Sequence, residues 1–257
     1  MGSARNAQSF DATCRMLRHI DIAMTPADAL LLPPADCYLV IDTLRATTTI
    51  ATLFARGLAR LTVVSSIDQA LAMRDGDVLL FGESGGLRPD GFDFGNSPVE
   101  TAGLDLVGRN AVLVTSNGTV ALCAVAPRGV TVAASLANLS AVADFAAMDE
   151  SALIVCSGNG GATRFSLEDF AVGAALVQAL ADTAGDLQMG DGAVAGSRVV
   201  DPEALIGSGS HASILRSLGL APDVDFAASP DSSFSVPRVT SFGDGWAELE
   251  DHAYRVS

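Results

Sequence analysis

Short apolar runs alternate with helical or polar segments along most of the chain. The first run, Cys37–Ile41, is β-rich and ends at Asp42, after which a helical pattern begins among Thr47–Thr49. Similar runs recur at 61–64, 77–81, 111–115, 130–133 and 153–156, and helical patterns cover about 66–73, 136–147 and 166–184. The last helix is apolar on almost every face, so we expect it to be deeply buried.

This alternation predicts an α/β fold, a three-layer α/β/α arrangement around a largely parallel or mixed sheet. Residues 1–19 are mixed and polar and are expected to form an N-terminal extension. Residues 20–257 are expected to form a single domain, with two lobes as the open alternative. Beyond Asp201 the pattern weakens to a short helix near 211–218 and a strand near 235–239. Ligands are expected beyond the carboxyl ends of the strands.

The charge of the chain limits its partners. Thirty acidic residues against fifteen basic ones give a net charge of −15, and every basic residue is arginine. Nucleic acid is therefore not an expected partner. An anionic ligand would be repelled by the global field, so local arginines, helix N-termini or a metal ion would have to capture it.

The cysteines and the hydropathy pattern indicate where the protein works. Its four cysteines are widely spaced without a CxxC pair, no secretory leader precedes them, and the apolar stretches are too short to span a membrane. We expect a cytoplasmic protein with reduced thiols and no membrane contact. Small apolar residues at the surface would support a homo-oligomer, with a homodimer as the simplest form.

The segment after the first strand is the first candidate site. Asp42 ends the strand, and Arg45 and the hydroxyls of Thr47, Thr48 and Thr49 lead into the following helix. These groups and the free N–H groups of the helix could bind a phosphate, while Asp42 could ligate a divalent cation or attack phosphorus. An ordinary capped helix explains the same residues equally well.

Two further loops follow strands. The loop 82–98 is rich in glycine and offers Glu83 as an oxygen ligand and Arg88 as a cation, although a surface Ω-loop has a similar composition. The segment Asn117–Thr119 places an amide, a flexible Gly118 and a hydroxyl after another strand, although an Asn-Gly turn is common.

The loop after Cys156 is also glycine-rich and leads through Arg164 to Ser166, which is a natural N-cap. Glu168 and Asp169 then occupy the first helical turn, where they could ligate a metal ion or simply interact favourably with the helix dipole. Arg164 lies eight positions after Cys156 rather than the six of cysteine phosphatases, so Cys156 is expected to be structural. Within a separate segment, His211 is a candidate general acid.

Read together, four motifs resemble the 2-phosphosulfolactate phosphatase family over roughly residues 20–240. They are Val40–Ile50, Gly82–Pro98, Asn117–Thr119 and Phe165–Asp169, supported by the segment at His211 and the run from Asp223 to Pro237. Two places depart from the family pattern: Ser84 stands where an arginine is usual, and the loop after Cys156 is longer than usual.

The resemblance implies a Mg²⁺-dependent phosphatase that hydrolyses 2-phosphosulfolactate or a related 2-hydroxycarboxylic acid phosphate ester, with a covalent phosphoenzyme or attack by metal-bound water as the two routes. The expected catalytic residues are Asp42, Arg45 and His211. The expected substrate-binding residues are Thr47, Thr48, Thr49, Arg88, Asn117, Gly118, Thr119 and Arg164. The expected metal ligands are Asp42, Glu83, Glu168 and Asp169. The alternative is a homologue with weakened catalysis that binds a small phosphorylated or sulfonated metabolite.

Overall fold

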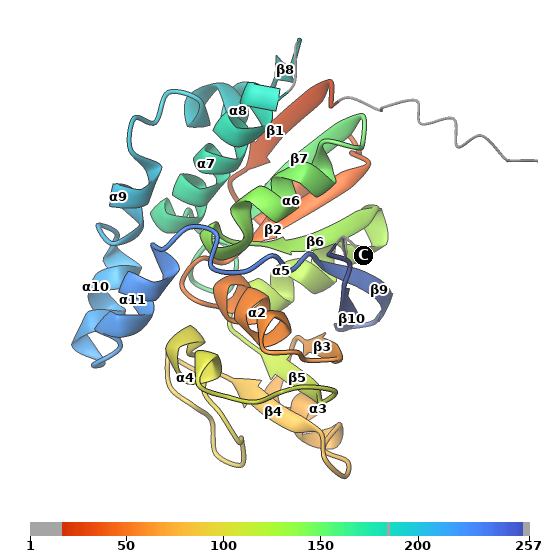
Figure 1. The fold of residues 1–257 in the computed structure, drawn as a ribbon, viewed down its shortest axis with the longest axis vertical. Coiled ribbons are helices and arrows are strands. Elements are labelled where there is room, and N and C mark those ends of the chain that lie inside the picture. The colour runs from red at the N-terminus through yellow and green to blue at the C-terminus, as the bar shows by residue number, and fades with distance from the viewer. Residues whose placement is uncertain (1–16, 184–185, 254–257) are drawn as a thin grey trace, which may run out of the picture.

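The computed structural model describes residues 17–183 and 186–253. In this part of the chain all strands join one sheet (Figure 1). The strands are β1 (His19–Ala23), β2 (Cys37–Ile41), β3 (Arg60–Val64), β4 (Leu79–Gly82), β5 (Asn110–Val114), β6 (Val130–Ala134), β7 (Ser151–Cys156), β8 (Gln188–Met189), β9 (Pro237–Gly243) and β10 (Trp246–Asp251).

The sheet consists of two parallel blocks joined by an antiparallel hairpin. Its strand order is β4-β5-β3-β10-β9-β6-β2-β7-β1-β8. Strands β4, β5 and β3 are parallel to one another, as are β6, β2, β7, β1 and β8. The pairings β3–β10, β10–β9 and β9–β6 are all antiparallel, so the two blocks run in opposite directions. The α/β fold with a mixed sheet is thus confirmed.

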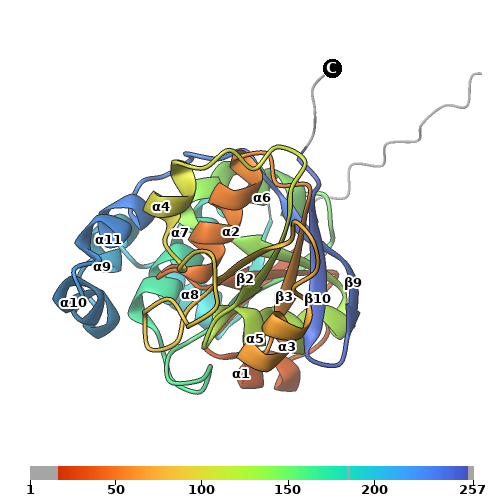
Figure 2. The same cartoon turned by 90° about the horizontal axis from the view of Figure 1, so that it is seen from below.

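Helices cover both sides of the sheet (Figure 2). They are α1 (Pro26–Leu31), α2 (Ala46–Ala55), α3 (Ile67–Ala72), α4 (Pro98–Ala102), α5 (Gly118–Val125), α6 (Leu139–Ala146), α7 (Leu167–Thr183), α8 (Asp191–Gly196), α9 (Pro202–Ile206), α10 (Ser210–Ser217) and α11 (Ala221–Ala227), with short 3₁₀ turns η1 (Ala126–Arg128) and η2 (Leu136–Asn138).

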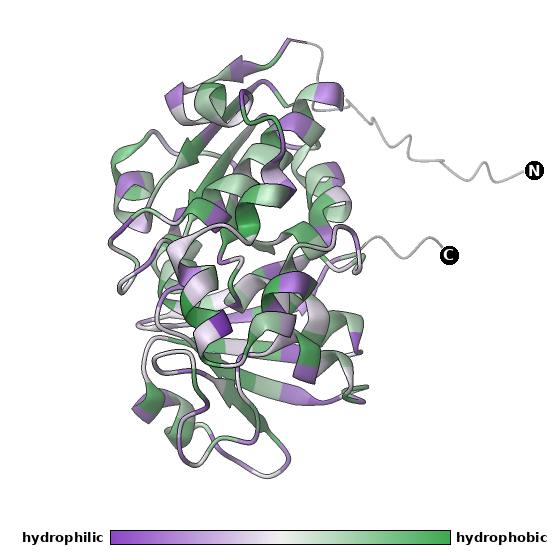
Figure 3. Ribbon diagram, turned by 90° about the vertical axis from the view of Figure 1, so that its left-hand side faces the viewer, coloured by the Kyte–Doolittle hydropathy of each residue, from purple (hydrophilic) through white to green (hydrophobic). Residues whose placement is uncertain are grey.

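Strand β2 lies between β6 and β7 in the larger block and shows how the core is divided. All five of its residues are buried, as expected for a parallel strand covered on both faces. Leu39 and Ile41 pack into a cluster with α6 and α7, while Tyr38 and Val40 pack into one with α1, α2 and α5. In Figure 3 the strands are accordingly largely green, and the purple residues lie mostly on helices and loops.

Most of the strands predicted from the sequence are found within two residues of their expected bounds, and α7 is buried along most of its length as expected. The prediction missed β1, β8 and β10, together with α1, α4, α8, α9 and α11. Leu17 is already part of the core, so the folded region begins before residue 20.

Cys37, Cys123 and Cys156 are free thiols, and Cys14 lies outside the described residues. Burial raises the pKa of Cys156 well above its usual value, and the charges of Asp169 and Glu168 add to the rise. Its burial and its raised pKa both agree with a structural role for the Cys156 thiol. In the described part of the chain, no helix has the length and apolar character needed to cross a membrane.

Candidate active site

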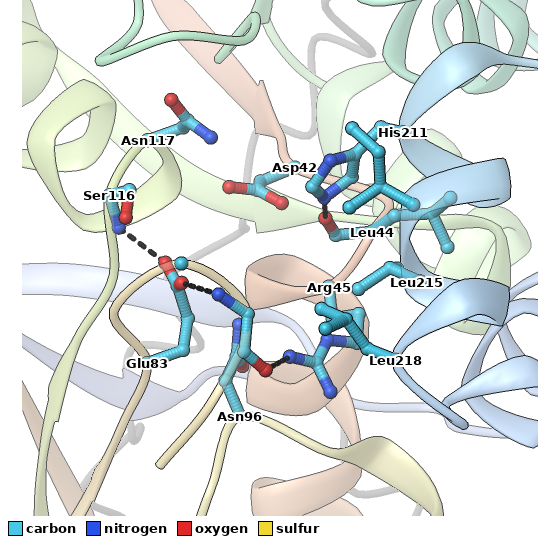
Figure 4. A pocket seen from close by; sticks show the side chains of 13 residues that line it. Asp42, Leu44, Arg45, Glu83, Asn96, Ser116, Asn117, His211, Leu215 and Leu218 are labelled. Atoms are coloured by element: carbon cyan, nitrogen blue, oxygen red, sulfur yellow. Dashed lines mark hydrogen bonds between the residues drawn. The ribbon is translucent and has the colours of Figure 1, made fainter. Parts of the chain in front are cut away.

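A cavity of about 230 Å³ opens at the carboxyl end of β2 (Figure 4). Four segments that are distant in sequence form its walls: the turn after β2, the loop after β4, the turn after β5, and α10. The lining residues are Asp42, Leu44, Arg45, Glu83, Gly85, Gly86, Asn96, Ser116, Asn117, His211, Ile214, Leu215 and Leu218. The structure therefore brings together three of the four sequence segments expected to carry the chemistry.

Asp42 lies at the centre of this site, 5% exposed. Its Oδ1 accepts a hydrogen bond of 3.1 Å from the backbone N–H of Ala46 in the first turn of α2. On the other side, a Cβ added to Gly118 at the start of α5 would lie 2.7 Å from Asp42 Oδ2 and 2.6 Å from Ala46 Cβ. Only glycine allows the two helix N-termini to approach the carboxylate this closely.

Burial raises the pKa of Asp42 to about 6, and the charge of Glu83 adds to the rise. The backbone N–H groups of Ala46 and Gly118 and the nearby His211 act in the opposite direction. The balance leaves a carboxylate that titrates close to neutrality, which is typical of a group that takes part in chemistry.

Two more carboxylates lie behind Asp42, outside the residues that line the cavity. Asp169 accepts hydrogen bonds from the backbone N–H of Thr43 at 2.8 Å and of Gly158 at 3.0 Å. Burial raises its pKa well above the usual value, and the charges of Asp42 and Glu168 raise it further. Glu168 is also buried, and a Cβ on Gly209 would lie 2.8 Å from its Oε2.

Glu83 faces the cavity from the opposite wall and organises the loop around it (Figure 4). Its Oε2 accepts from the N–H of Gly86 at 2.8 Å, and its Oε1 accepts from the N–H of Ser116 at 2.7 Å. One carboxylate thus ties the loop after β4 to the turn after β5.

Arg45 is fully buried and paired. Its Nη1 lies 2.6 Å from Asp223 Oδ2, and its Nη2 donates to the carbonyl of Gly86 at 2.7 Å. Asp223 in α11 also accepts from the hydroxyl of Ser97 at 2.6 Å. Arg45 therefore lines the cavity with a charge already balanced by an acid that the sequence did not single out as its partner.

His211 in α10 reaches across to the turn after β2. Its Nε2 lies 3.0 Å from the carbonyl oxygen of Leu44. Because a carbonyl only accepts, Nε2 must carry the hydrogen, which leaves Nδ1 as the nitrogen that can exchange a proton.

The threonine hydroxyls are engaged within their own turns. Those of Thr47 and Thr48 donate to the carbonyls of Asp42 and Thr43, both at 2.9 Å, and that of Thr119 donates to the carbonyl of Thr115 at 3.0 Å. The Thr49 hydroxyl is buried without a partner among the described residues. Thr47, Thr48 and Thr119 thus hold the helix starts in place through their hydroxyls. None of the four threonines lines either cavity.

The two expected arginines differ in position. Arg88 is exposed, donates to the carbonyl of Asp93 at 3.0 Å and does not line the cavity. Arg164 lines an adjoining cavity of about 350 Å³, which shares Asn117, His211 and Ile214 with the first. The structure therefore brings only Arg164 next to the site.

Asn96 is a site residue that sequence reasoning missed. It lines the cavity at 3% exposure, and its Oδ1 has no hydrogen-bond partner among the described residues. A buried amide oxygen without a partner is costly unless a ligand or water satisfies it. Its place in the glycine-rich loop after β4 was the only signal in the sequence.

The carboxylates that line the cavity are candidate ligands of a divalent cation. No group of three or more His, Cys, Asp or Glu side chains within 17–183 and 186–253 is arranged to hold a metal ion. Mg²⁺, however, commonly takes one or two protein carboxylates and completes its shell with waters and phosphate oxygens. Asp42 and Glu83 meet that smaller requirement, since both line the cavity and the charge of Glu83 disfavours ionisation of Asp42.

Comparison with known proteins identifies relatives over most of the chain. A family model described as 2-phosphosulpholactate phosphatase matches residues 25–241. A probable 2-phosphosulfolactate phosphatase of Deinococcus radiodurans is 42% identical over 220 residues, covering 81% of this chain and 90% of that protein. One of Thermotoga petrophila is 37% identical over 229 residues, covering 86% and 96%.

Proposed function

The chain belongs to the 2-phosphosulfolactate phosphatase family, and from this premise we propose that it is a Mg²⁺-dependent phosphoric monoester hydrolase. Its substrate is 2-phosphosulfolactate or a related 2-hydroxycarboxylic acid phosphate ester. The observation that supports this most is the buried Asp42 carboxylate, which opens into a cavity between two helix N-termini. Helix N-termini attract phosphoryl oxygens through free N–H groups and the helix dipole.

Asp42 is the proposed nucleophile. One of its carboxylate oxygens attacks phosphorus in line with the ester oxygen, the P–O bond to the substrate breaks, and an aspartyl phosphate forms. Water then attacks this phosphorus and releases phosphate, which restores the carboxylate. Direct attack by a water molecule on the substrate remains the alternative route.

His211 is the proposed proton donor. When its ring is protonated, Nδ1–H can give its proton to the leaving alkoxide while Nε2–H keeps its hydrogen bond to Leu44. Arg45 supports the site by holding Gly86 and Asp223 in place. Asp42 and Glu83 would hold Mg²⁺, which when bound supplies charge neutralisation for the phosphoryl oxygens.

The test is the Asp42→Asn variant, assayed for phosphate release from 2-phospholactate and 2-phosphosulfolactate with and without Mg²⁺. We expect the loss of turnover to be about a thousandfold or more, as for other removed nucleophiles, with an unchanged circular dichroism spectrum. Mass spectrometry of rapidly quenched wild-type enzyme should detect a phosphate adduct on Asp42. Near-wild-type hydrolysis by Asp42→Asn would contradict the assignment, and turnover without an adduct would favour direct attack by water.

Binding of the ester without hydrolysis would instead identify a homologue with weakened catalysis. The expected homodimer and cytoplasmic location remain predictions of the sequence.

A further inference from the structure

The adjoining cavity contains a cation that nothing else in the described structure neutralises. Arg164 is exposed, and its guanidinium has neither a hydrogen-bonded nor an ionic partner among the described residues. The second arginine that lines either cavity is Arg45, and its charge is already balanced by Asp223. In a chain with a net charge of −15, an arginine beside a catalytic cavity and without an acidic partner is a specific place for an anion.

The loop that carries Arg164 is fixed in position. Asn159 and Arg164 pair as an antiparallel bridge, with N···O distances of 2.7 and 3.0 Å. Asn117 Oδ1 accepts from the N–H groups of Gly161 and Ala162 at 2.9 and 3.0 Å, which ties this loop to the start of α5. The loop backbone is therefore preorganised, which lowers the entropic cost of ordering it on binding.

Gly160 brings the loop backbone against the guanidinium. Its φ is +63°, and a Cβ at this position would lie 2.9 Å from Arg164 Nε. The loop backbone thus packs against the Arg164 side chain. The polar side chains that also line this cavity are those of Asn117, Asn159, Ser210 and His211. A carboxylate beside Arg164 would therefore meet amide, hydroxyl and imidazole groups as well as the guanidinium.

The rest of the catalytic cavity is apolar on one side. Leu44, Ile214, Leu215 and Leu218 form this wall, and Asp42 and Glu83 are the acids that line the same space. A second strongly acidic group on the substrate would have no unpaired arginine there to balance it.

We propose, on the basis of the function proposed above, that this site selects a phosphate monoester with a single further carboxylate. Arg164 binds that carboxylate, and a small apolar remainder lies against α10. A 2-phospholactate-type ester fits this description, whereas 2-phosphosulfolactate carries an additional sulfonate that the two cavities do not neutralise. Arg164 is thus a specificity-determining residue.

The first test compares kcat/KM for 2-phospholactate, 2-phosphosulfolactate and ethyl phosphate in the wild-type protein with Mg²⁺. We expect kcat/KM for 2-phospholactate to exceed that for ethyl phosphate by about tenfold or more, the factor expected for one charge-assisted hydrogen bond. It should also exceed kcat/KM for 2-phosphosulfolactate, because no second unpaired arginine lines the two cavities to balance the sulfonate. An equal or higher kcat/KM for 2-phosphosulfolactate would overturn the proposal.

The second test uses Arg164→Ala, with Arg164→Lys as the conservative variant and Arg198→Ala as the control. Arg198 is also exposed and lines neither cavity. Arg164→Ala should lower the ratio of kcat/KM for 2-phospholactate to that for ethyl phosphate by about 10- to 100-fold. Arg164→Lys should recover part of that ratio, and Arg198→Ala should keep it. An unchanged ratio in Arg164→Ala would overturn the proposal.

A binding measurement separates this proposal from the proposed reaction. Calorimetric titration of 2-phospholactate in EDTA, in which hydrolysis is blocked if the reaction needs Mg²⁺, should show at least about tenfold weaker binding to Arg164→Ala than to wild type. This result in a protein without phosphatase activity would support the Arg164 site and reject the reaction. Active enzyme with equal binding in both proteins would reject the Arg164 site alone.

Discussion

Asp42 carries an ionisable carboxylate in a place where its charge is disfavoured. Burial is the main cause, and no arginine contacts the carboxylate among the described residues. Such a group lowers the stability of the folded protein while it stays ionised. The site therefore combines reactivity with a local cost in stability, as is common for catalytic groups.

The pH dependence of unfolding should reveal this cost. An aspartate in the unfolded chain titrates near pH 4, whereas Asp42 in the folded protein titrates at a pKa of about 6. The folded state therefore holds the proton on Asp42 more tightly than the unfolded chain does. This proton binding stabilises the fold fully below about pH 4, and the stabilisation is lost as the pH rises through about 6. Asp42→Asn has no carboxyl group at this position to titrate. Its free energy of unfolding should therefore exceed that of wild type by up to about 3 kcal/mol at pH 8.

Urea denaturation in EDTA at pH 5 and pH 8 measures the difference, because EDTA removes cations that would stabilise the ionised form. Asp75→Asn is the matched control, since Asp75 is exposed. An Asp42→Asn advantage of the same size at both pH values would contradict the burial argument.

Arg45 shows the limit of sequence reasoning about single residues. Its type and its place before a helix predicted a phosphate-binding cation, and the structure does place it in the cavity wall. Its partner Asp223, however, is 178 residues away. No local pattern encodes a pair at that separation, so sequence reasoning found the residue but not the partner that neutralises it.

The segments that follow the strands show what short-range sequence patterns can predict. Asp42, Glu83 and Asn117 all follow predicted strands, and all line one cavity. The sequence indicated each loop because strand ends and glycine-rich turns are local features. It did not indicate that α5 approaches Asp42, because that contact depends on how the strand blocks are arranged.

Gly118→Ala tests the approach of α5 to β2. The added methyl group would lie within 2.8 Å of Asp42 and Ala46 atoms, so the start of α5 must move. We expect the free energy of unfolding to fall by about 1–3 kcal/mol, as for other overpacked sites, and kcat to fall by about tenfold or more because the carboxylate shifts.

Gly103→Ala is the control for this change. Gly103 caps α4 at φ −83°, and the nearest atom to an added Cβ is 3.5 Å away. The kcat of the Gly103→Ala variant should stay near that of wild type. Wild-type kcat in Gly118→Ala would show that the close approach of the two helix starts has no part in catalysis.

The sheet as a whole depends on its last two strands. Hairpin β9–β10 pairs with β3 on one side and β6 on the other, so it joins the two parallel blocks. The sequence predicted an α/β fold from alternating elements, and a strand near 235–239. It did not predict where that strand inserts, because strand order depends on contacts between residues more than a hundred positions apart.

Leu249→Ala should therefore destabilise the entire molecule and not only its C-terminal end. Leu249 is fully buried in β10, opposite Leu61 of β3 and Val239 of β9. Truncating a buried leucine costs about 2–5 kcal/mol, and here the lost contacts lie at the junction of the two blocks. Phe242→Ala in the same hairpin is the control, because Phe242 is 49% exposed. Urea denaturation followed by amide hydrogen exchange should show lower protection in both β2 and β5 for Leu249→Ala. Lower protection confined to β9 and β10 would mean that the blocks hold together without the hairpin.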